Sequence, residues 1–105
     1  MTSQSSPQLR LNHKNRSTEQ LIRAAHHQLD LVGSHMAPSR VSKLVRRYQR
    51  TVTHTGMPFD IWFRAQTLLA EQAAGRELPS GAYRGFDPTA RTAIARLMHE
   101  AVGPR

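Results

Sequence analysis

The sequence predicts an all-α protein, a small four-helix domain preceded by a flexible basic N-terminal arm. Apolar residues recur at helical spacing in four segments, near residues 17–32, 37–54, 58–74 and 87–102. Capping residues, glycines and prolines stand at the ends of these segments. No segment alternates with the period of two expected of a half-buried strand. We therefore divide the chain into an arm over residues 1–16 and a single helical domain over residues 17–105.

Length and composition restrict what the protein can be. A chain of 105 residues suits one domain with a modest core. The 15 Lys and Arg against 7 Asp and Glu leave a net charge of +8, and the pI is about 11.5, which favours negatively charged partners. Of the basic residues, 13 are Arg, whose planar guanidinium suits phosphates, carboxylates and guanine edges. A GC-rich genome would produce the same bias.

Several classes of protein are disfavoured at this stage. The absence of cysteine excludes disulfides, thiolate metal sites and thiol catalysis. No apolar run approaches the roughly 20 residues needed to cross a bilayer, and the N-terminus lacks the apolar core of a signal peptide. We expect a soluble, cytoplasmic protein without membrane contact, and the sequence does not indicate its oligomeric state.

The first helix is expected to begin after a polar, basic arm over residues 1–16. Ser17 and Gln20 match a capping box, and Glu19 stands where the helix dipole favours a carboxylate. Its core-facing stripe consists of Leu21, Ile22, Ala25, Leu29 and Val32. Gly33 is a natural C-terminal stop.

Residues 33–36 read GSHM, a string that is commonly left between a cleavable tag and a cloned start codon. Under that interpretation Met36 would be the native start. No poly-His run precedes the string, however, and residues 17–32 carry a well-formed helix pattern. We treat the chain as continuous.

The second helix, near residues 37–54, separates an apolar stripe from a row of cations. The stripe consists of Val41, Leu44, Val45, Tyr48 and Val52. The cations are Arg40, Lys43, Arg46, Arg47 and Arg50, with no acidic residue between Ala37 and Thr53. Pro38 suits the first helical turn, and Gly56 and Pro58 end the segment. This helix is expected to dock on a core with one face and to offer the other to an anionic partner.

The third helix, near residues 58–74, is the most apolar and is expected to lie at the centre of the core. Its apolar residues are Phe59, Ile61, Trp62, Phe63, Leu68, Leu69, Ala70 and Ala73, and its polar strip is Asp60, Arg64, Thr67 and Glu71. Asp60 is placed to pair with Arg64 at i+4. Trp62 is expected to anchor the core, with a partner-binding hot spot as the alternative.

A loop over residues 75–86 follows, rich in glycine, with Tyr83 and Phe86 expected to hold it against the core. Asp87 as N-cap and Pro88 at the first helical position then begin the last helix. Its inner face consists of Ala90, Ala93, Ile94, Leu97, Met98 and Ala101.

We find no pattern that indicates an enzyme, a metal site or a cofactor. The seven carboxylates are scattered, and the six histidines show no recognised ligand spacing. No glycine-rich phosphate loop follows a strand.

The basic residues instead predict non-enzymatic binding to nucleic acid, with DNA favoured over RNA. The first two helices and their short connection resemble a helix-turn-helix loosely, because the turn glycine falls two residues early and Leu31 occupies a place usually held by alanine. The candidate binding residues are Ser39, Arg40, Lys43, Arg46, Arg47, Arg50, Arg76 and Arg84.

Two other interpretations of the same cations remain open. The protein can modulate or inhibit a larger partner by docking on its acidic surface, with Trp62 or the aromatic loop as anchors. The cations can also form a solvated face without a partner, although such faces usually mix charges of both signs.

Overall fold

The computed structural model describes residues 16–103, in which all regular structure is helical. The four α-helices are α2 (Thr18–Val32), α3 (Pro38–Arg47), α4 (Phe59–Ala73) and α5 (Pro88–Val102). A π-helical turn, η2 (Tyr48–Val52), and a 3-10 turn, η3 (Thr53–Thr55), continue α3. The predicted all-α domain of four helices is therefore confirmed. Apart from Arg16, the predicted N-terminal arm lies outside the described residues.

Local capping fixes where two of the helices begin, as the sequence predicts. The Ser17 hydroxyl accepts a hydrogen bond from the Gln20 amide at 3.1 Å, and the Gln20 side chain accepts one from the Ser17 amide at 2.9 Å. This reciprocal pair satisfies two amides that the first helical turn would otherwise leave free. The Asp87 carboxylate likewise accepts from the Ala90 amide at 2.9 Å and begins α5. Gly33 ends α2 in the left-handed conformation, with φ of 68°.

α3 and its continuation form one helical segment with a widened turn near its end. The Thr53 amide donates to the Tyr48 carbonyl five residues back, and the backbone stays in the right-handed helical region. The Thr51 hydroxyl donates to the Arg47 carbonyl at 2.8 Å. Threonine at this spacing competes for the helical carbonyls, and consecutive β-branched residues disfavour a regular helix. The predicted helix over 37–54 is thus present as three successive helical forms.

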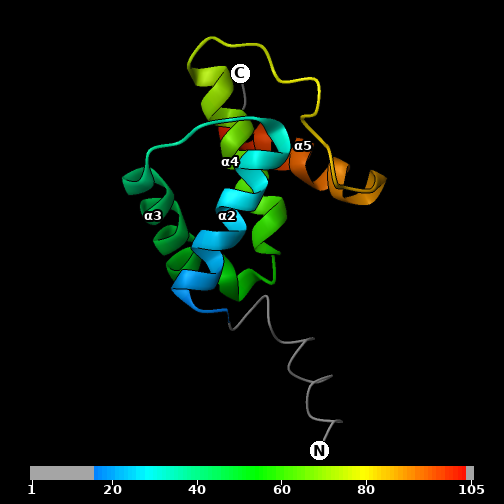
Figure 1. Ribbon diagram of the computed structural model, residues 1–105. Helices are drawn as coiled ribbons and strands as arrows, with labels where there is room; N and C mark the ends of the chain where they lie inside the picture. Colours follow the sequence, from blue (N-terminus) through cyan, green and yellow to red (C-terminus); the bar gives the residue numbers. More distant parts are fainter. Residues whose placement is uncertain (1–15, 104–105) are drawn as a thin grey trace, which may run out of the picture.

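α4 lies between α2 and α5 and contributes the largest number of buried residues, as predicted (Figure 1). α2 contacts both α3 and α4, whereas α5 packs on α4. In the view of Figure 1, α2 and α3 run in opposite directions, and the segment 75–87 arches over the top of the molecule before it descends on the side away from α3. The ends of this segment are held by α4 and α5.

The core consists of two apolar clusters that share α4. The first joins α2, α3 and the start of α4 through Leu21, Ala25, Leu29, Val41, Leu44, Val45, Tyr48, Phe59, Trp62 and Phe63. The second joins α4, the following loop and α5 through Ala65, Leu68, Ala82, Ile94 and Met98, with Tyr83 and Phe86 packed against it. The predicted contact of the loop aromatics with the core is confirmed. Ala73 and Ala101, expected in the core, are exposed because each lies in the last turn of its helix.

Candidate nucleic-acid interface

The basic residues of α3 and η2 all project into solvent. We call this surface, formed by Arg40, Lys43, Arg46, Arg47 and Arg50, the cationic face; every one of these residues is exposed, as is Ser39 in the first turn. The opposite side of the same segment is in the core, where Val41 and Val45 are at most 1 % exposed. The docking of the apolar stripe therefore fixes the direction in which the cations point.

Within residues 16–103, no ion pair joins an acidic residue to the cationic face. The ion pairs in this range join Arg16 to Asp60, Arg23 to Glu19 and Arg76 to Glu71. Along the cationic face, five pairs of like charges stand three or four residues apart. Each such pair destabilises a helix by about 0.2–0.5 kcal/mol, so the face costs about 1–2.5 kcal/mol of stability. This unfavourable energy is what an anionic partner would remove.

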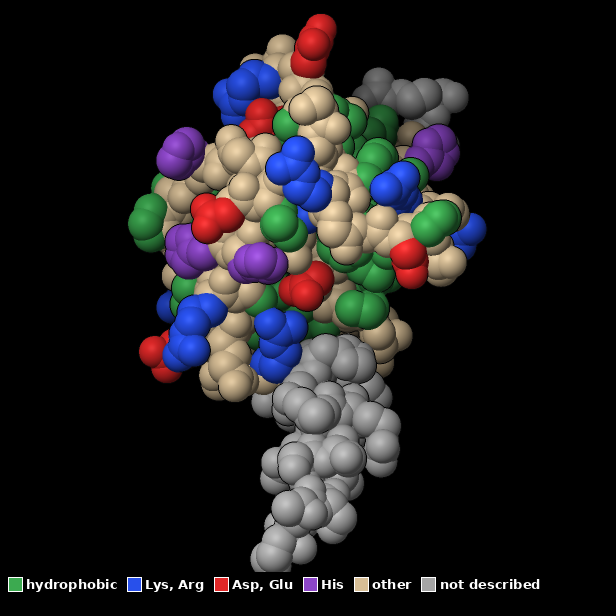
Figure 2. Space-filling view, turned by 45° about the vertical axis from the view of Figure 1, so that its right-hand side comes forward, with side chains coloured by type: hydrophobic (Ala, Val, Ile, Leu, Met, Phe, Trp, Pro, Cys, Tyr) green, Lys and Arg blue, Asp and Glu red, His purple; other side chains and the backbone are tan. Residues whose placement is uncertain are grey.

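A different face of the molecule has mixed charge. Figure 2 brings the right-hand side of Figure 1 forward and shows Lys and Arg side chains interspersed with Asp, Glu and His. This is the mixture of signs expected of a surface that serves solubility alone. The cationic face, by contrast, has five cations and no acidic residue in its own stretch of sequence, which makes it a candidate for an anionic partner.

Of the two loop cations proposed as extensions, the structure brings Arg76 next to Arg40. Both line a cavity of about 230 Å³ between the turn that joins α2 to α3 and the C-terminal half of α4. We call it the turn cavity; its lining consists of His35, Met36, Ala37, Arg40, Thr67, Ala70, Glu71 and Arg76. Arg84 is exposed, but it belongs to the second half of the loop, which descends on the side away from α3 (Figure 1).

One wall of the turn cavity is a close ion pair. The Arg76 Nε donates to the Glu71 Oε1 at 2.6 Å, and the Glu71 side chain is only 12 % exposed. This hydrogen bond from Arg76, together with one from Ser34, lowers the pKa of the Glu71 carboxyl against the opposing effect of burial. Glu71 therefore presents a carboxylate, and not a neutral acid, to the cavity at neutral pH.

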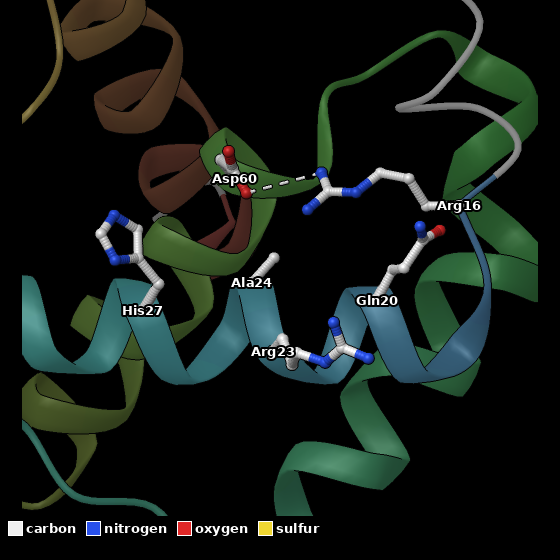
Figure 3. Close-up of a pocket in the computed structure, with 6 residues that line it drawn as sticks. All are labelled: Arg16, Gln20, Arg23, Ala24, His27 and Asp60. Atoms are coloured by element: carbon white, nitrogen blue, oxygen red, sulfur yellow. Dashed lines mark ion pairs between the residues drawn. The ribbon is translucent and has the colours of Figure 1, made fainter. Parts of the chain in front are cut away.

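A second, more polar hollow lies between α2 and the start of α4. It has a volume of about 370 Å³ and is lined by Arg16, Gln20, Arg23, Ala24, His27 and Asp60. Figure 3 shows the Arg16 guanidinium directed at Asp60, with which it pairs at 3.9 Å. Asp60 Oδ1 is shielded from solvent without a hydrogen bond. The predicted pair of Asp60 with Arg64 is wrong, because Arg64 turns towards α2 and the loop instead.

Arg64 is fully buried and holds three parts of the fold together. Its Nε and Nη2 donate to the Gln28 Oε1 at 3.1 and 2.8 Å, and its Nη1 donates to the Ala82 carbonyl at 2.8 Å. The guanidinium carbon lies 4.7 Å from the centre of the Phe86 ring. Burial lowers the pKa of Arg64, and the charge of Asp60 partly opposes this effect.

Sequence reasoning missed this buried network, although one signal was present. Gln28 occupies a position on the buried side of α2, between Ala25 and Val32, and is 5 % exposed. A long amide on an apolar stripe indicates a buried polar partner, because an unsatisfied amide in a core is costly.

The aromatic anchors considered for an acidic protein partner are used within the fold. Trp62 is 6 % exposed and packs against Tyr48 and Phe59, with ring centres 5.6 and 6.3 Å apart. Tyr83 and Phe86 pack against the second cluster. Little aromatic surface is therefore left for a partner, either at Trp62 or at the aromatic loop.

Comparisons with family models, curated proteins and solved structures found no match. The cationic face and the turn cavity are therefore interpreted from their own chemistry. Within residues 16–103, no three His, Asp or Glu side chains are grouped so that they could hold a metal ion. No helix in this part of the chain has both the length and the apolarity that a membrane span requires.

Proposed function

We propose that this is a cytoplasmic, non-enzymatic regulatory protein that binds nucleic acid, DNA in preference to RNA, through the cationic face. The single observation that supports the proposal is the row of five exposed cations on α3 and η2, which no ion pair within 16–103 joins to an acidic residue. A basic stripe along one side of a helix is the electrostatic footprint of nucleic-acid binding, and its cations displace condensed counterions when they contact phosphates.

The residues of the face have different expected roles. The later cations of the face, Lys43, Arg46, Arg47 and Arg50, are proposed to contact phosphates, which position the nucleic acid. Ser39 and Arg40, in the first turn of α3, are the residues proposed to reach base edges. Arg76 lies beside Arg40 but is already paired with Glu71, whereas Arg84 belongs to a different part of the surface.

The test is the salt dependence of binding to short duplex and single-stranded oligonucleotides, measured by fluorescence anisotropy. Affinity is expected to fall as a power of salt concentration, and each of Lys43→Gln, Arg46→Gln and Arg47→Gln is expected to reduce the slope by about one. Arg96→Gln, an exposed arginine on α5, is the matched control and is expected to leave the slope unchanged.

Two outcomes would overturn the proposal. Absence of binding to DNA and RNA at about 50 mM salt would contradict the proposed nucleic-acid binding, because phosphate contacts are strongest at low ionic strength. Equal slopes for Lys43→Gln and Arg96→Gln would show that the cationic face is not the contact surface. Nuclease-resistant binding to one acidic protein, without affinity for nucleic acid, would establish the alternative of a protein-binding modulator.

A further inference from the structure

The turn cavity opens at the N-terminal end of the cationic face, and Arg40 belongs to both. A strand whose phosphates follow α3 therefore brings one of its nucleotides to the mouth of this cavity. This continuity makes the cavity part of the same proposed interface, so the inference below rests on the proposed function. The question is which part of a nucleotide the cavity suits.

The inner lining of the turn cavity is unsuitable for a phosphate. Met36, Ala37 and Ala70 present apolar surface, and the carboxylate of Glu71 lies beside them. A phosphate entering here would lose its hydration against apolar atoms and meet a like charge. The Arg76 cation is already paired with Glu71 at 2.6 Å, so Arg40 at the edge of the cavity is the cation that a phosphate can contact.

The same lining is well suited to a base. Apolar side chains cover the faces of an unstacked ring, and the planar groups of Arg76 and His35 offer stacking surfaces of the kind on which single-stranded bases lie. Glu71 supplies an acceptor for an exocyclic amino group, as acidic side chains do for cytosine. The volume of about 230 Å³ lies just below the ~300–1,000 Å³ of typical small-molecule pockets, which suits a single ring system.

We infer that the turn cavity receives one unstacked, amino-bearing base of a single-stranded nucleic acid whose phosphates lie along the cationic face. A duplex keeps its bases stacked and paired, so it can contact the cationic face but cannot place a base in the turn cavity. Thymine and uracil lack the exocyclic amino group that Glu71 would accept from. The protein is therefore expected to bind single strands more tightly than duplexes, and oligo(dC) more tightly than oligo(dT).

The experiment compares Ala70→Leu, which places a larger side chain in the cavity, with Ala95→Leu, the same change on the exposed surface of α5. Binding of short oligo(dC), oligo(rC), oligo(dT) and duplex DNA is measured at about 50 mM salt. Ala70→Leu is expected to weaken oligo(dC) binding about tenfold, the effect of losing one stacked base, and to leave duplex binding unchanged. Glu71→Gln is expected to reduce the preference for oligo(dC) over oligo(dT). The ratio of oligo(rC) to oligo(dC) affinity identifies the preferred sugar.

The outcomes separate this inference from the proposed function. If the wild-type protein binds neither single strands nor duplexes, the proposed function itself fails. If it binds, but Ala70→Leu and Ala95→Leu retain equal affinity for oligo(dC), only the inference about the cavity is overturned. Amide NMR of the wild-type protein with oligo(dC) gives a test that needs no variant, since shifts at Met36, Ala70 and Glu71 support base entry. Shifts confined to α3 beyond Arg40 refute it.

Discussion

The buried contact between Arg64 and Gln28 gives the sharpest test of how this fold is stabilised. Arg64 is fully buried, yet its three side-chain hydrogen bonds go to neutral acceptors, two of them to the Gln28 Oε1. The two single substitutions therefore differ in what they leave behind. Arg64→Met leaves neutral acceptors without donors, whereas Gln28→Leu leaves a buried cation without its main acceptor.

The magnitudes follow from this asymmetry. Arg64→Met leaves Gln28 Oε1 and the Ala82 carbonyl without a donor but removes the cost of burying a charge, so we expect a loss of about 2 kcal/mol. Gln28→Leu leaves the buried Arg64 guanidinium without its main acceptor, and we expect the free energy of unfolding to fall by about 3–4 kcal/mol. The double variant replaces both partners by apolar groups and leaves only the Ala82 carbonyl unsatisfied, so we expect a loss of at most about 2 kcal/mol, no larger than that of Arg64→Met.

The assay is unfolding in guanidinium chloride, followed by circular dichroism. It is applied to the wild type, the two single variants and the double variant, and the results are analysed as a double-mutant cycle. The double variant is expected to be more stable than Gln28→Leu, and the three losses together correspond to a coupling energy of at least about 3 kcal/mol between the two side chains. Additive losses, or a Gln28→Leu variant milder than Arg64→Met, would refute the argument, because the guanidinium would then not depend on Gln28. An unchanged m-value confirms that the comparison concerns stability alone.

Three further predictions concern ionisable groups. The Tyr48 hydroxyl donates a hydrogen bond to the Met57 carbonyl, and burial raises the pKa of Tyr48. The stability that protonated Tyr48 contributes is therefore complete below the pKa of an unfolded tyrosine, about 10, and is lost as pH rises through the pKa of Tyr48 in the folded protein. Tyr48→Phe is expected to cost about 1 kcal/mol at neutral pH and to remove this alkaline loss, as measured by unfolding at several pH values. The stability contributed by Glu71 depends on pH in the opposite direction, because the hydrogen bond from Arg76 lowers the pKa of its carboxyl. This contribution is complete above the pKa of an unfolded glutamate and is lost as pH falls through the pKa of Glu71 in the folded protein. The stability difference between wild type and Glu71→Gln is therefore expected to vanish in acid. Lys43→Gln removes three like-charge pairs on α3 and is expected to stabilise the protein by about 0.6–1.5 kcal/mol in low salt, and by less in high salt, whereas a loss of stability would contradict the repulsion argued here.

The helix ends could be predicted from the sequence because their signals are local. The Ser17 capping box, the left-handed Gly33 and the Asp87 cap act within a few residues of where they stand, and each is present in the structure. The exposure of the cationic face was predictable for a similar reason, since an apolar stripe on a helix fixes the direction of the opposite side.

By contrast, the local sequence pattern could not predict which distant segments pack over the polar strip of α4. The strip Asp60, Arg64, Thr67 and Glu71 was identified correctly as polar, but α2, the α2–α3 turn and the loop after α4 lie over it. An i, i+4 pair of Asp60 and Arg64 satisfies the helical rule, yet burial of Arg64 required acceptors that only distant segments provide. The proximity of Arg76 to Arg40 likewise depends on the path of a loop and not on spacing.

The polar strip of α4 connects stability and the proposed site. At its first end Asp60 lines the hollow against α2, in its middle Arg64 is sealed by Gln28, and at its last end Glu71 lines the turn cavity. Polar groups on a central helix are costly unless each finds a partner. The middle of the strip meets that requirement internally, whereas Glu71 divides its contacts between Arg76 and an open cavity. A ligand that donates a hydrogen bond to the exposed part of the Glu71 carboxylate would give this last polar group a partner. Binding and stability are therefore expected to be coupled at the turn cavity, and not at the buried centre of α4.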